Sequence, residues 1–452
     1  MGSQYLVVID RNVLLAGRTA QLTARTALST ANGALAAQHV ALDQFGAELL
    51  KPKAGPLVDK LAAIRSLNHV DLGRSLNGIA TPLIPHSPHL PLMPSLPSSG
   101  RYKVLAAVGA LILDDDDLKS SSLANVEGVT IYENRTFAAP APAASAAVLS
   151  VPPWHLTKIG RVPGYPQTGA GTLVGVLDTG IDATHPEFAG KAIHFNEFDS
   201  TGASISTIAR DAGDHGTHVC GIISGASSGV APNAELAVAA VLTTPGPNGL
   251  TGSTIQIATG LNWLLSHPFR PNQPGVDVIN ASLGIGVAAG GAPRTGYNGF
   301  LQSIVRNALL APGVLVIAAI GNDGLLGEGF HGSPGNYPEV LGVGATDQQD
   351  FVADFSDWDT AWVPPGGALI TKPELCAPGD NVVSSVPGGG YQKMRGTSMA
   401  APVVSGVAAL LLEKDPTLVG DPARLRAELQ ARATGPAIAC PPNLGGAGRI
   451  TV

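Results

Sequence analysis

This chain has few charged residues, few cysteines and no long apolar run. Charged residues make up only 13% of its 452 residues and 44% are hydrophobic, which excludes wholesale disorder and provides for a sizeable core. The net charge is −7 and no block of lysine and arginine appears, so nothing in the charge pattern supports a nucleic-acid or anionic-membrane partner. The apolar runs Val314–Ile320 and Val403–Leu412 are both too short to span a bilayer.

Cysteine is too rare here to build a disulfide framework. Cys220, Cys376 and Cys440 leave at least one thiol unpaired, which favours a reducing compartment. Residues 1–10 carry neither the basic region nor the cleavage site of a secretory signal peptide. The sequence as written therefore predicts a cytoplasmic protein, and a secreted protein whose signal had been removed would look the same.

Two changes in composition divide the chain. Residues 81–100 contain six prolines, which block helices and central strands, and residues 138–150 are small and uncharged. Because proteases reach segments of the second kind, we place a domain boundary there. The prediction is a smaller domain over residues 1–137, a linker over 138–149 and a large domain over 150–452. The smaller domain has strand-like runs at Tyr5–Asp10, Tyr102–Leu113 and Val129–Tyr132 and a helical stretch at Leu118–Leu123.

Short apolar runs and helical stretches alternate in the large domain. The runs have strand length and are apolar on both faces: Leu173–Leu177, Leu236–Leu242, Val276–Asn280, Val314–Ile320 and Val340–Val343. The helical stretches are His218–Ser224, Thr254–Leu265, Gly299–Leu310 and Ala401–Glu413. Strands of this kind belong in a parallel sheet that is covered on both sides. The sequence therefore predicts an α/β fold, a mainly parallel sheet with helices on both faces, preceded by a smaller α+β domain.

Three short motifs supply the parts that acyl transfer by a serine requires: a nucleophile, a base and an acid that orients the base. Asp178 ends a buried strand in V-L-D-T-G-I-D, His215 leads into a helix in D-H-G-T-H-V-C-G, and Ser398 begins a helix in G-T-S-M-A-A-P. Ligands of open parallel sheets gather beyond the carboxyl ends of the strands, where these motifs would meet. They lie 37 (215 − 178) and 183 (398 − 215) residues apart, so only the fold can assemble them.

Other interpretations of single motifs are weaker. Gly225–Gly229 matches the G-x-S-x-G pattern of α/β-hydrolases, but it does not follow a strand as that motif requires. His215 and His218 have one-turn spacing, but zinc needs a third ligand. Cys220 is interpreted as a buried small residue, with a reactive thiol close to His215 as the alternative. An esterase or lipase, and an inactive binding scaffold, are the alternatives to a peptidase.

The large domain resembles the subtilisin family of serine proteases, from about Ser150 to about Leu418. Besides the three motifs above, the segments N-A-S-L-G (280–284), A-I-G-N-D-G (319–324) and K-P-E-L-C-A-P-G (372–379) match that family. The resemblance implies a serine endopeptidase that hydrolyses polypeptides through an acyl-enzyme. In such an enzyme Asp178 would orient the base, His215 would be the general base and Ser398 the nucleophile.

The same resemblance implies residues that bind the substrate. Asn322, together with the backbone N–H of Ser398, matches the donors of the oxyanion hole. Ser282, Leu283 and Gly284 match the segment that pairs with an extended substrate backbone. Asp323 falls where the family places the floor of the primary specificity pocket, and an acid there would admit basic side chains.

The N-terminal half resembles the inhibitory propeptide of this family. Tyr5–Asp10 resembles its first strand, and Leu105–Leu123 with Gly128–Glu133 resembles its closing half. This implies a zymogen that cuts itself within residues 138–150 and whose own N-terminal domain acts as an intramolecular inhibitor. The segment Arg135–Pro140 would then lie along Ser282–Gly284 as a substrate does.

No cofactor and no metal site is predicted. The family's tight calcium site uses a longer loop after the histidine helix, whereas Gly225–Pro232 is short and lacks carboxylates. Calcium takes six to eight oxygen ligands, and no dedicated loop supplies them. A calcium requirement is not supported, although sites made of backbone carbonyls leave no mark in a sequence.

Overall fold

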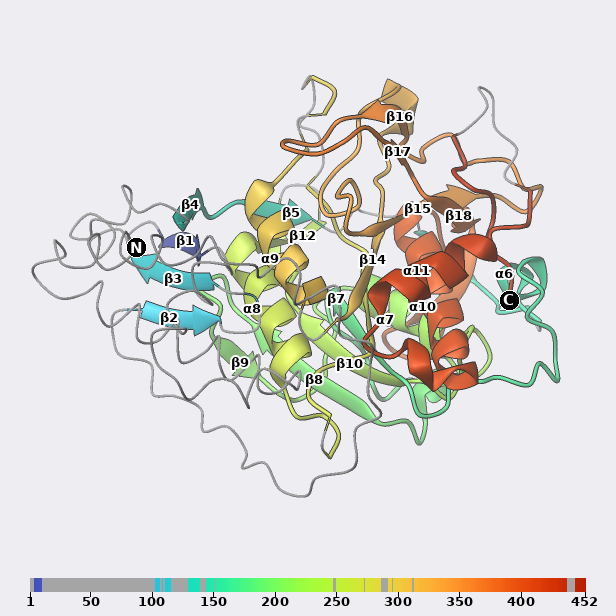
Figure 1. Ribbon diagram of the computed structural model, residues 1–452. Helices are drawn as coiled ribbons and strands as arrows, with labels where there is room; N and C mark the ends of the chain where they lie inside the picture. Colours follow the sequence, from blue (N-terminus) through green and yellow to red (C-terminus); the bar gives the residue numbers. More distant parts are fainter. Residues whose placement is uncertain are drawn as a thin grey trace, which may run out of the picture. The chain divides into compact units, whose positions relative to one another are not determined.

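The computed structural model describes residues 4–9, 102–105, 108, 110–114, 129–138, 144–150, 152–246, 249–271, 273–285, 292–294, 296–310, 313–436 and 444–452 (Figure 1). The chain separates into two compact units. One consists of residues 1–134 with 270–274, and the other of residues 135–269 with 275–452.

The described part of the first unit is a four-stranded sheet in the order β2-β3-β1-β4. Its strands are β1 (Gln4–Ile9), β2 (Tyr102–Leu105), β3 (Ala110–Asp114) and β4 (Val129–Glu133). The prediction of one strand over Tyr102–Leu113 is wrong, because β2 and β3 pair antiparallel, with Lys103 opposite Ile112. Buried Leu6, Val7 and Leu111 form its core. The predicted helix at Leu118–Leu123 and the proline-rich stretch lie outside the described residues.

An eight-stranded sheet forms the centre of the second unit, in the order β18-β15-β14-β13-β7-β10-β8-β9. All neighbours are parallel except β9, which runs antiparallel to β8. The strands are β7 (Leu173–Asp178), β8 (Ile193–Phe198), β9 (Ser204–Ser206), β10 (Glu235–Ala240), β13 (Val278–Ala281), β14 (Leu315–Ala319), β15 (Leu341–Thr346) and β18 (Leu375–Pro378). Strands β7, β14 and β15 are buried along their whole length, so the sheet must be covered on both faces. The predicted mainly parallel sheet of an α/β fold is confirmed.

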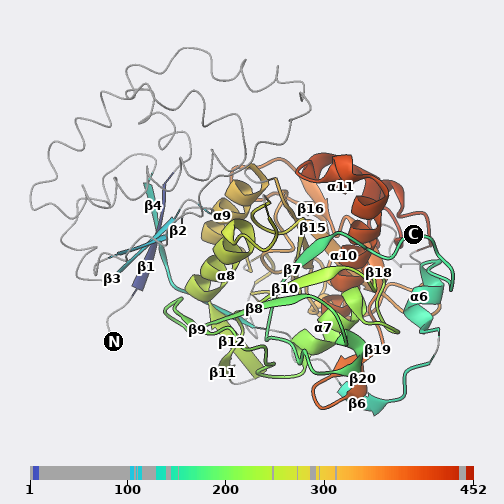
Figure 2. The same cartoon turned by 90° about the horizontal axis from the view of Figure 1, so that it is seen from below.

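Helices cover both faces of this sheet (Figure 2). On one side α10 (Thr397–Lys414) crosses β13, β14 and β15 and packs against α7 (His215–Ser224). On the other side α8 (Thr254–Ser266) packs on β7, β8 and β10, and α9 (Gly299–Leu310) packs on β14. The two remaining α-helices of the described chain are α6 (Trp154–Lys158) and α11 (Pro422–Ala431). Within the described part of the chain, none of the helices combines the length and apolarity that a bilayer span needs.

Three small sheets lie outside the central one in the second unit. Strands β11 (Thr244–Gly246), β12 (Gly249–Ser253) and β5 (Thr136–Ala138) form one sheet in that order. A second consists of β19 (Val382–Val386), β20 (Gly390–Met394) and β6 (Ala144–Ala147), and the third pairs β16 (Asp359–Trp362) with β17 (Ile370–Lys372). In the first two sheets, short strands from residues 135–147 pair with strands more than a hundred residues later in the chain.

Candidate active site

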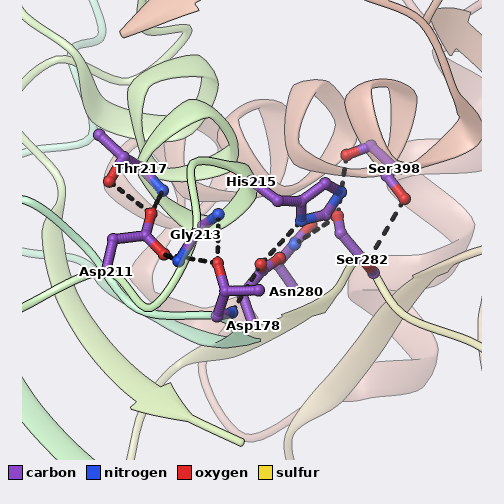
Figure 3. Close-up of polar contacts among 10 residues, drawn as sticks. Asp178, Asp211, Gly213, His215, Thr217, Asn280, Ser282 and Ser398 are labelled. Carbon is purple, nitrogen blue, oxygen red and sulfur yellow. Dashed lines mark hydrogen bonds and ion pairs between the residues drawn. The ribbon is translucent and has the colours of Figure 1, made fainter. Parts of the chain in front are cut away.

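Asp178 is the last residue of β7 and is completely buried. Because β7 is a central strand of the parallel sheet, its carboxyl end places this side chain at the edge where ligands of such sheets gather. One carboxylate oxygen, Oδ1, accepts a hydrogen bond from the backbone N–H of Thr179 at 2.7 Å and lies 2.7 Å from Nδ1 of His215. This fixes the carboxylate against the imidazole (Figure 3).

His215 is the first residue of α7. Asp211 accepts hydrogen bonds from the backbone N–H of Thr217 at 2.7 Å and from its hydroxyl at 2.6 Å, which holds the first turn of the helix (Figure 3). The same carboxylate accepts from the Thr179 hydroxyl at 2.6 Å and so connects this turn to the residue after Asp178. Gly216 is required here, since a Cβ would lie 2.1 Å from the carbonyl oxygen of Gly180.

The electrostatics of His215 are set by burial and by carboxylates. Burial alone would lower its pKa, but the charge of Asp178, the hydrogen bond that His215 donates to that carboxylate and the charges of Asp211 and Asp214 outweigh it and raise the pKa above 6.5. Its other ring nitrogen, Nε2, is buried and has no hydrogen-bond partner among the described residues. In Figure 3 the imidazole lies between Asp178 and Ser398.

Ser398 is the second residue of α10, and its residue surface is 1% exposed. Its hydroxyl donates to the backbone carbonyl of Ser282 at 3.4 Å, while the Ser282 hydroxyl donates to the backbone carbonyl of Ser398 at 2.9 Å (Figure 3). Buried Asn280 donates to the Ser282 hydroxyl at 3.0 Å and accepts from Ser405 of α10 at 2.9 Å. This chain of hydrogen bonds ties the start of α10 to the end of β13.

Asn322 lies in the loop after β14, and its side-chain oxygen is held by the start of α10. The backbone N–H and the hydroxyl of Thr397 donate to Oδ1 of Asn322 at 2.8 and 2.9 Å. Because the backbone N–H of Thr397 can only donate, the atom of the Asn322 amide that it contacts must be the oxygen. The Nδ2 group of Asn322 is then left as a hydrogen-bond donor. Ser398 follows Thr397 directly, and the first N–H groups of a helix have no intrahelical partner. Two donors are thus available at the start of α10.

Asp357 clamps the backbone on both sides of Asn322. Its N–H donates to the Gly321 carbonyl at 3.1 Å, and its carboxyl oxygen accepts a hydrogen bond from the N–H of Asp323. Burial and the nearby charge of Asp323 raise the pKa of Asp357 well above its usual range, which favours the protonated carboxyl. Asp323 itself precedes a short 3-10 helix, Gly324–Leu326, and is half-buried.

An extended segment of the chain already lies against residues 282–284. Ala138 and Gly284 exchange two backbone hydrogen bonds, each 3.2 Å long. Leu283, the residue before Gly284, is buried. On its other side β5 pairs antiparallel with β12, and the Phe137 side chain is completely buried opposite Gly252. Residues 136–138 are therefore held as an extended strand between β12 on one edge and Gly284 on the other.

Comparison with known proteins decides the family. The sequence profile of the Subtilase family matches residues 169–448. The chain belongs to this family. It is 38% identical over 265 residues to the subtilisin-like protease PopC of Myxococcus xanthus strain DK1622, covering 55% of this chain and 53% of PopC. It is 34% identical over 269 residues to subtilisin-like protease 5 of Arthroderma benhamiae, covering 58% of this chain and 59% of that protein.

A solved structure gives the same result for the fold. This subtilase is similar to a cold adapted subtilisin-like serine proteinase, with a TM-score of 0.52 and 29% identity over 68% of this chain and 97% of the other. The predicted resemblance to subtilisin-like serine proteases is thereby confirmed for the large domain. The chain spans about half to three-fifths of the length of the curated relatives named here.

His218, Cys220 and Cys376 of this subtilase, which the sequence also singled out, lie buried in the described structure. Nε2 of His218 lies 3.1 Å from the carbonyl oxygen of Gln392, and burial lowers the His218 pKa to about 3. Cys220 is completely buried, and burial raises its thiol pKa well above the usual value, so the interpretation as a small core residue holds. Cys376 is buried as well, and Cys440 lies outside the described residues.

No group of three or more His, Cys, Asp or Glu side chains suited to a metal ion occurs among the described residues. In the loop 225–232, the backbone N–H groups of Ser227 and Ser228 donate to the carboxylate of Glu187 at 2.8 and 3.1 Å. The Glu187 carboxylate near this loop is thus occupied by protein donors.

Several residues that shape the site were not predicted from the sequence. Asp211, Thr217, Asn280 and Asp357 act on the site through hydrogen bonds to other residues. Thr217 lies inside the D-H-G-T-H motif and Asn280 inside N-A-S-L-G, so the motifs contained a signal for both. Asp211 and Asp357 lie outside all the sequence motifs named above.

Proposed function

We propose that this subtilase is a serine endopeptidase and that Asp178, His215 and Ser398 form its catalytic triad. The observation that carries the proposal is the buried pair of Asp178 and His215, 2.7 Å apart, beside a serine at the start of a buried helix. A carboxylate on Nδ1 fixes the tautomer in which Nε2 accepts a proton. Raising the pKa of His215 prepares it to receive that proton.

The reaction follows from these roles. After a rotation of its hydroxyl away from Ser282, Ser398 Oγ attacks the substrate carbonyl carbon while its proton moves to Nε2 of His215. The oxyanion accepts hydrogen bonds from Nδ2 of Asn322 and the N–H of Ser398. Collapse of the intermediate breaks the C–N bond, and the proton on His215 passes to the leaving amine. Water then hydrolyses the acyl-enzyme by the same proton transfers in a second round.

A peptidase is favoured over an esterase by the way the site receives β5. Backbone hydrogen bonds from Gly284 on one side and pairing with β12 on the other select an extended polypeptide, which a simple ester does not provide. The esterase motif at Gly225–Gly229 follows α7, a helix, and not a strand. For Asp323 we propose that its carboxylate lies at the floor of the primary specificity pocket and admits basic substrate side chains there.

We further propose that the protein is made as a zymogen, with an inhibitory domain over residues 1–137, a processing linker over 138–149 and a catalytic domain over 150–452. Residues 136–138 occupy the extended-backbone site, and β6 starts at Ala144 beside the strand that leads to Ser398. The bond that is cut would therefore lie in the stretch between Ala138 and Ala144. Tethering keeps the occupying segment at an effective concentration in the millimolar range, so it inhibits until it is released.

The test is the fate of purified full-length protein over time. Wild type is expected to convert to a fragment that starts within residues 139–144 and then to hydrolyse casein, whereas Ser398→Ala stays full-length and inactive. Casein hydrolysis by intact wild type would refute the zymogen and leave the endopeptidase. Absence of hydrolysis after the linker is cut by an added protease would refute the endopeptidase.

A further inference from the structure

We propose that Asn280 and Ser405 are positioning residues for the nucleophile, which together hold the backbone of Ser398 where the reaction takes place. This inference rests on the proposed endopeptidase function and deepens it, because neither residue belongs to the triad, the oxyanion hole or residues 282–284. Both side chains are completely buried, so neither contacts a substrate. They act on Ser398 through the hydroxyl of Ser282.

A proline in α10 deprives the Ser398 carbonyl of its regular partner. In an α-helix each carbonyl accepts a hydrogen bond from the N–H four residues later, which for Ser398 is residue 402 (398 + 4). Pro402 lies inside α10 and has no N–H to donate. A buried carbonyl that loses its donor destabilises the fold, so this position needs a donor from outside the helix. The hydroxyl of Ser282 supplies it at 2.9 Å.

The hydrogen bonds behind Ser282 run in one direction (Figure 3). Ser282 gives its one hydroxyl proton to the Ser398 carbonyl, so its oxygen must accept from Asn280, at 3.0 Å. The NH2 side of the Asn280 amide therefore faces Ser282, and the amide oxygen accepts from the Ser405 hydroxyl at 2.9 Å. That hydroxyl also donates to the carbonyl of Ala401 at 3.1 Å. We call the three bonds from Ser405 to the Ser398 carbonyl the support chain.

The support chain begins and ends on the same helix. Ser405 follows Ser398 by seven residues (405 − 398), which is two turns of α10. Between them the chain passes through Asn280 of β13, a strand of the central sheet, and Ser282 just after it. The helix is thus attached to the end of β13 at two points, two turns apart. One such contact would let α10 pivot or slide on the strand, whereas two contacts prevent both motions.

The position of the Ser398 backbone enters the proposed reaction twice. The Oγ of Ser398 attacks the substrate carbonyl, and its N–H is one of the two oxyanion donors, so a shift of this residue displaces both groups. Because a displacement of about 1 Å costs up to about a hundredfold in rate, even a partial shift is measurable. Loss of the support chain should therefore slow the chemical step at Ser398 and change substrate binding much less.

The experiment compares the self-processed wild-type enzyme with Ser405→Ala, Asn280→Ala and the double variant, well below the unfolding temperature of each. The first readout is the rate at which a fluorophosphonate labels Ser398, and the second is kcat and KM for a synthetic peptide of residues 132–149. We expect each single change to lower the labelling rate and kcat about tenfold and to change KM less than about threefold. Because both residues serve one chain, the double variant should lose little more than the slower single variant.

Ser224→Ala is the matched control. Ser224 is a buried serine at the end of α7, and its hydroxyl donates to the carbonyl of Ala234 at 2.7 Å. This change removes one buried hydrogen bond, as Ser405→Ala does, so it should lower the unfolding temperature similarly and leave the labelling rate unchanged.

Two results would overturn the positioning role and leave the endopeptidase intact. One is a labelling rate within twofold of wild type in both single variants, with only their unfolding temperature lowered. The other is a double variant whose loss is the product of the two single losses. If Asn280→Ala does not fold, the comparison of Ser405→Ala with Ser224→Ala decides alone. A wild-type enzyme that is neither labelled nor active would refute the proposed function itself.

Discussion

The burial of Phe137 leads to a prediction about substrate choice. Its side chain is 0% exposed, and its cross-strand partner is Gly252, which has no side chain. Full burial of a phenylalanine side chain contributes about 1.5–3 kcal/mol relative to exposure. If a substrate binds as β5 does, replacing the corresponding phenylalanine by alanine should reduce kcat/KM by about 10- to 150-fold, at about 1.4 kcal/mol for each factor of ten.

The assay is hydrolysis of the peptide of residues 132–149 by the processed enzyme, with phenylalanine or alanine at the position of Phe137. The loss should appear mainly in KM, because this contact is made equally in the ground state and in the transition state. Alanine at the position of Thr136, whose side chain is exposed, is the control and should change kcat/KM less than about twofold. A loss below about threefold for the phenylalanine change would refute the reasoning that β5 occupies the substrate site.

Three further predictions concern the catalytic groups. Asn322→Ala should lower kcat by about 10²–10³ with little change in KM, and a rise in KM alone would contradict the oxyanion role. His215 must be neutral to accept a proton, and its pKa is raised above 6.5. We therefore expect kcat to fall as the pH drops through a value above 6.5. A pH profile in which kcat falls only below 6.5 would contradict this. Asp357→Ala should lower kcat about tenfold, because Asn322 would be displaced. Asp357→Asn keeps an acceptor for the Asp323 N–H and should retain activity. Equal losses of kcat in both variants would exclude a positioning role for Asp357.

The central sheet could be predicted because its strands are apolar on both faces. The runs Leu173–Leu177 and Val314–Ile320 indicate buried strands covered by helices. They appear as β7 and β14, and each end of these strands lies within one residue of the predicted bound. The apolar pattern alone starts this helix at Ala401, whereas the motif around Ser398 already predicts a helix from that serine, and α10 begins at Thr397. Its first turn follows the glycine at 396 and begins with two small polar residues, Thr397 and Ser398, which add nothing to the apolar signal.

The parts of the site that the sequence did not predict depend on contacts between distant residues. Ala138 pairs with Gly284, and Asp357 binds the N–H of Asp323. In neither pair does the sequence around one residue indicate which residue is its partner. Strands β5 and β6 are three and four residues long, too short for alternation to be recognised. The run Tyr102–Leu113 illustrates the same limit, because two short antiparallel strands that follow closely in an apolar sequence look like one strand.

The central claim is that Ser398 is a nucleophile activated by His215 and Asp178. The most direct measurement is reaction of the self-processed enzyme with a fluorophosphonate, followed by mass spectrometry of the labelled peptide, because only an activated serine reacts. We predict that the wild-type enzyme carries one label, on Ser398. Labelling should be at least about a thousandfold slower in Asp178→Asn and absent in Ser398→Ala. A label on another serine, or a processed enzyme that cuts peptides while Ser398 stays unlabelled, would contradict the account.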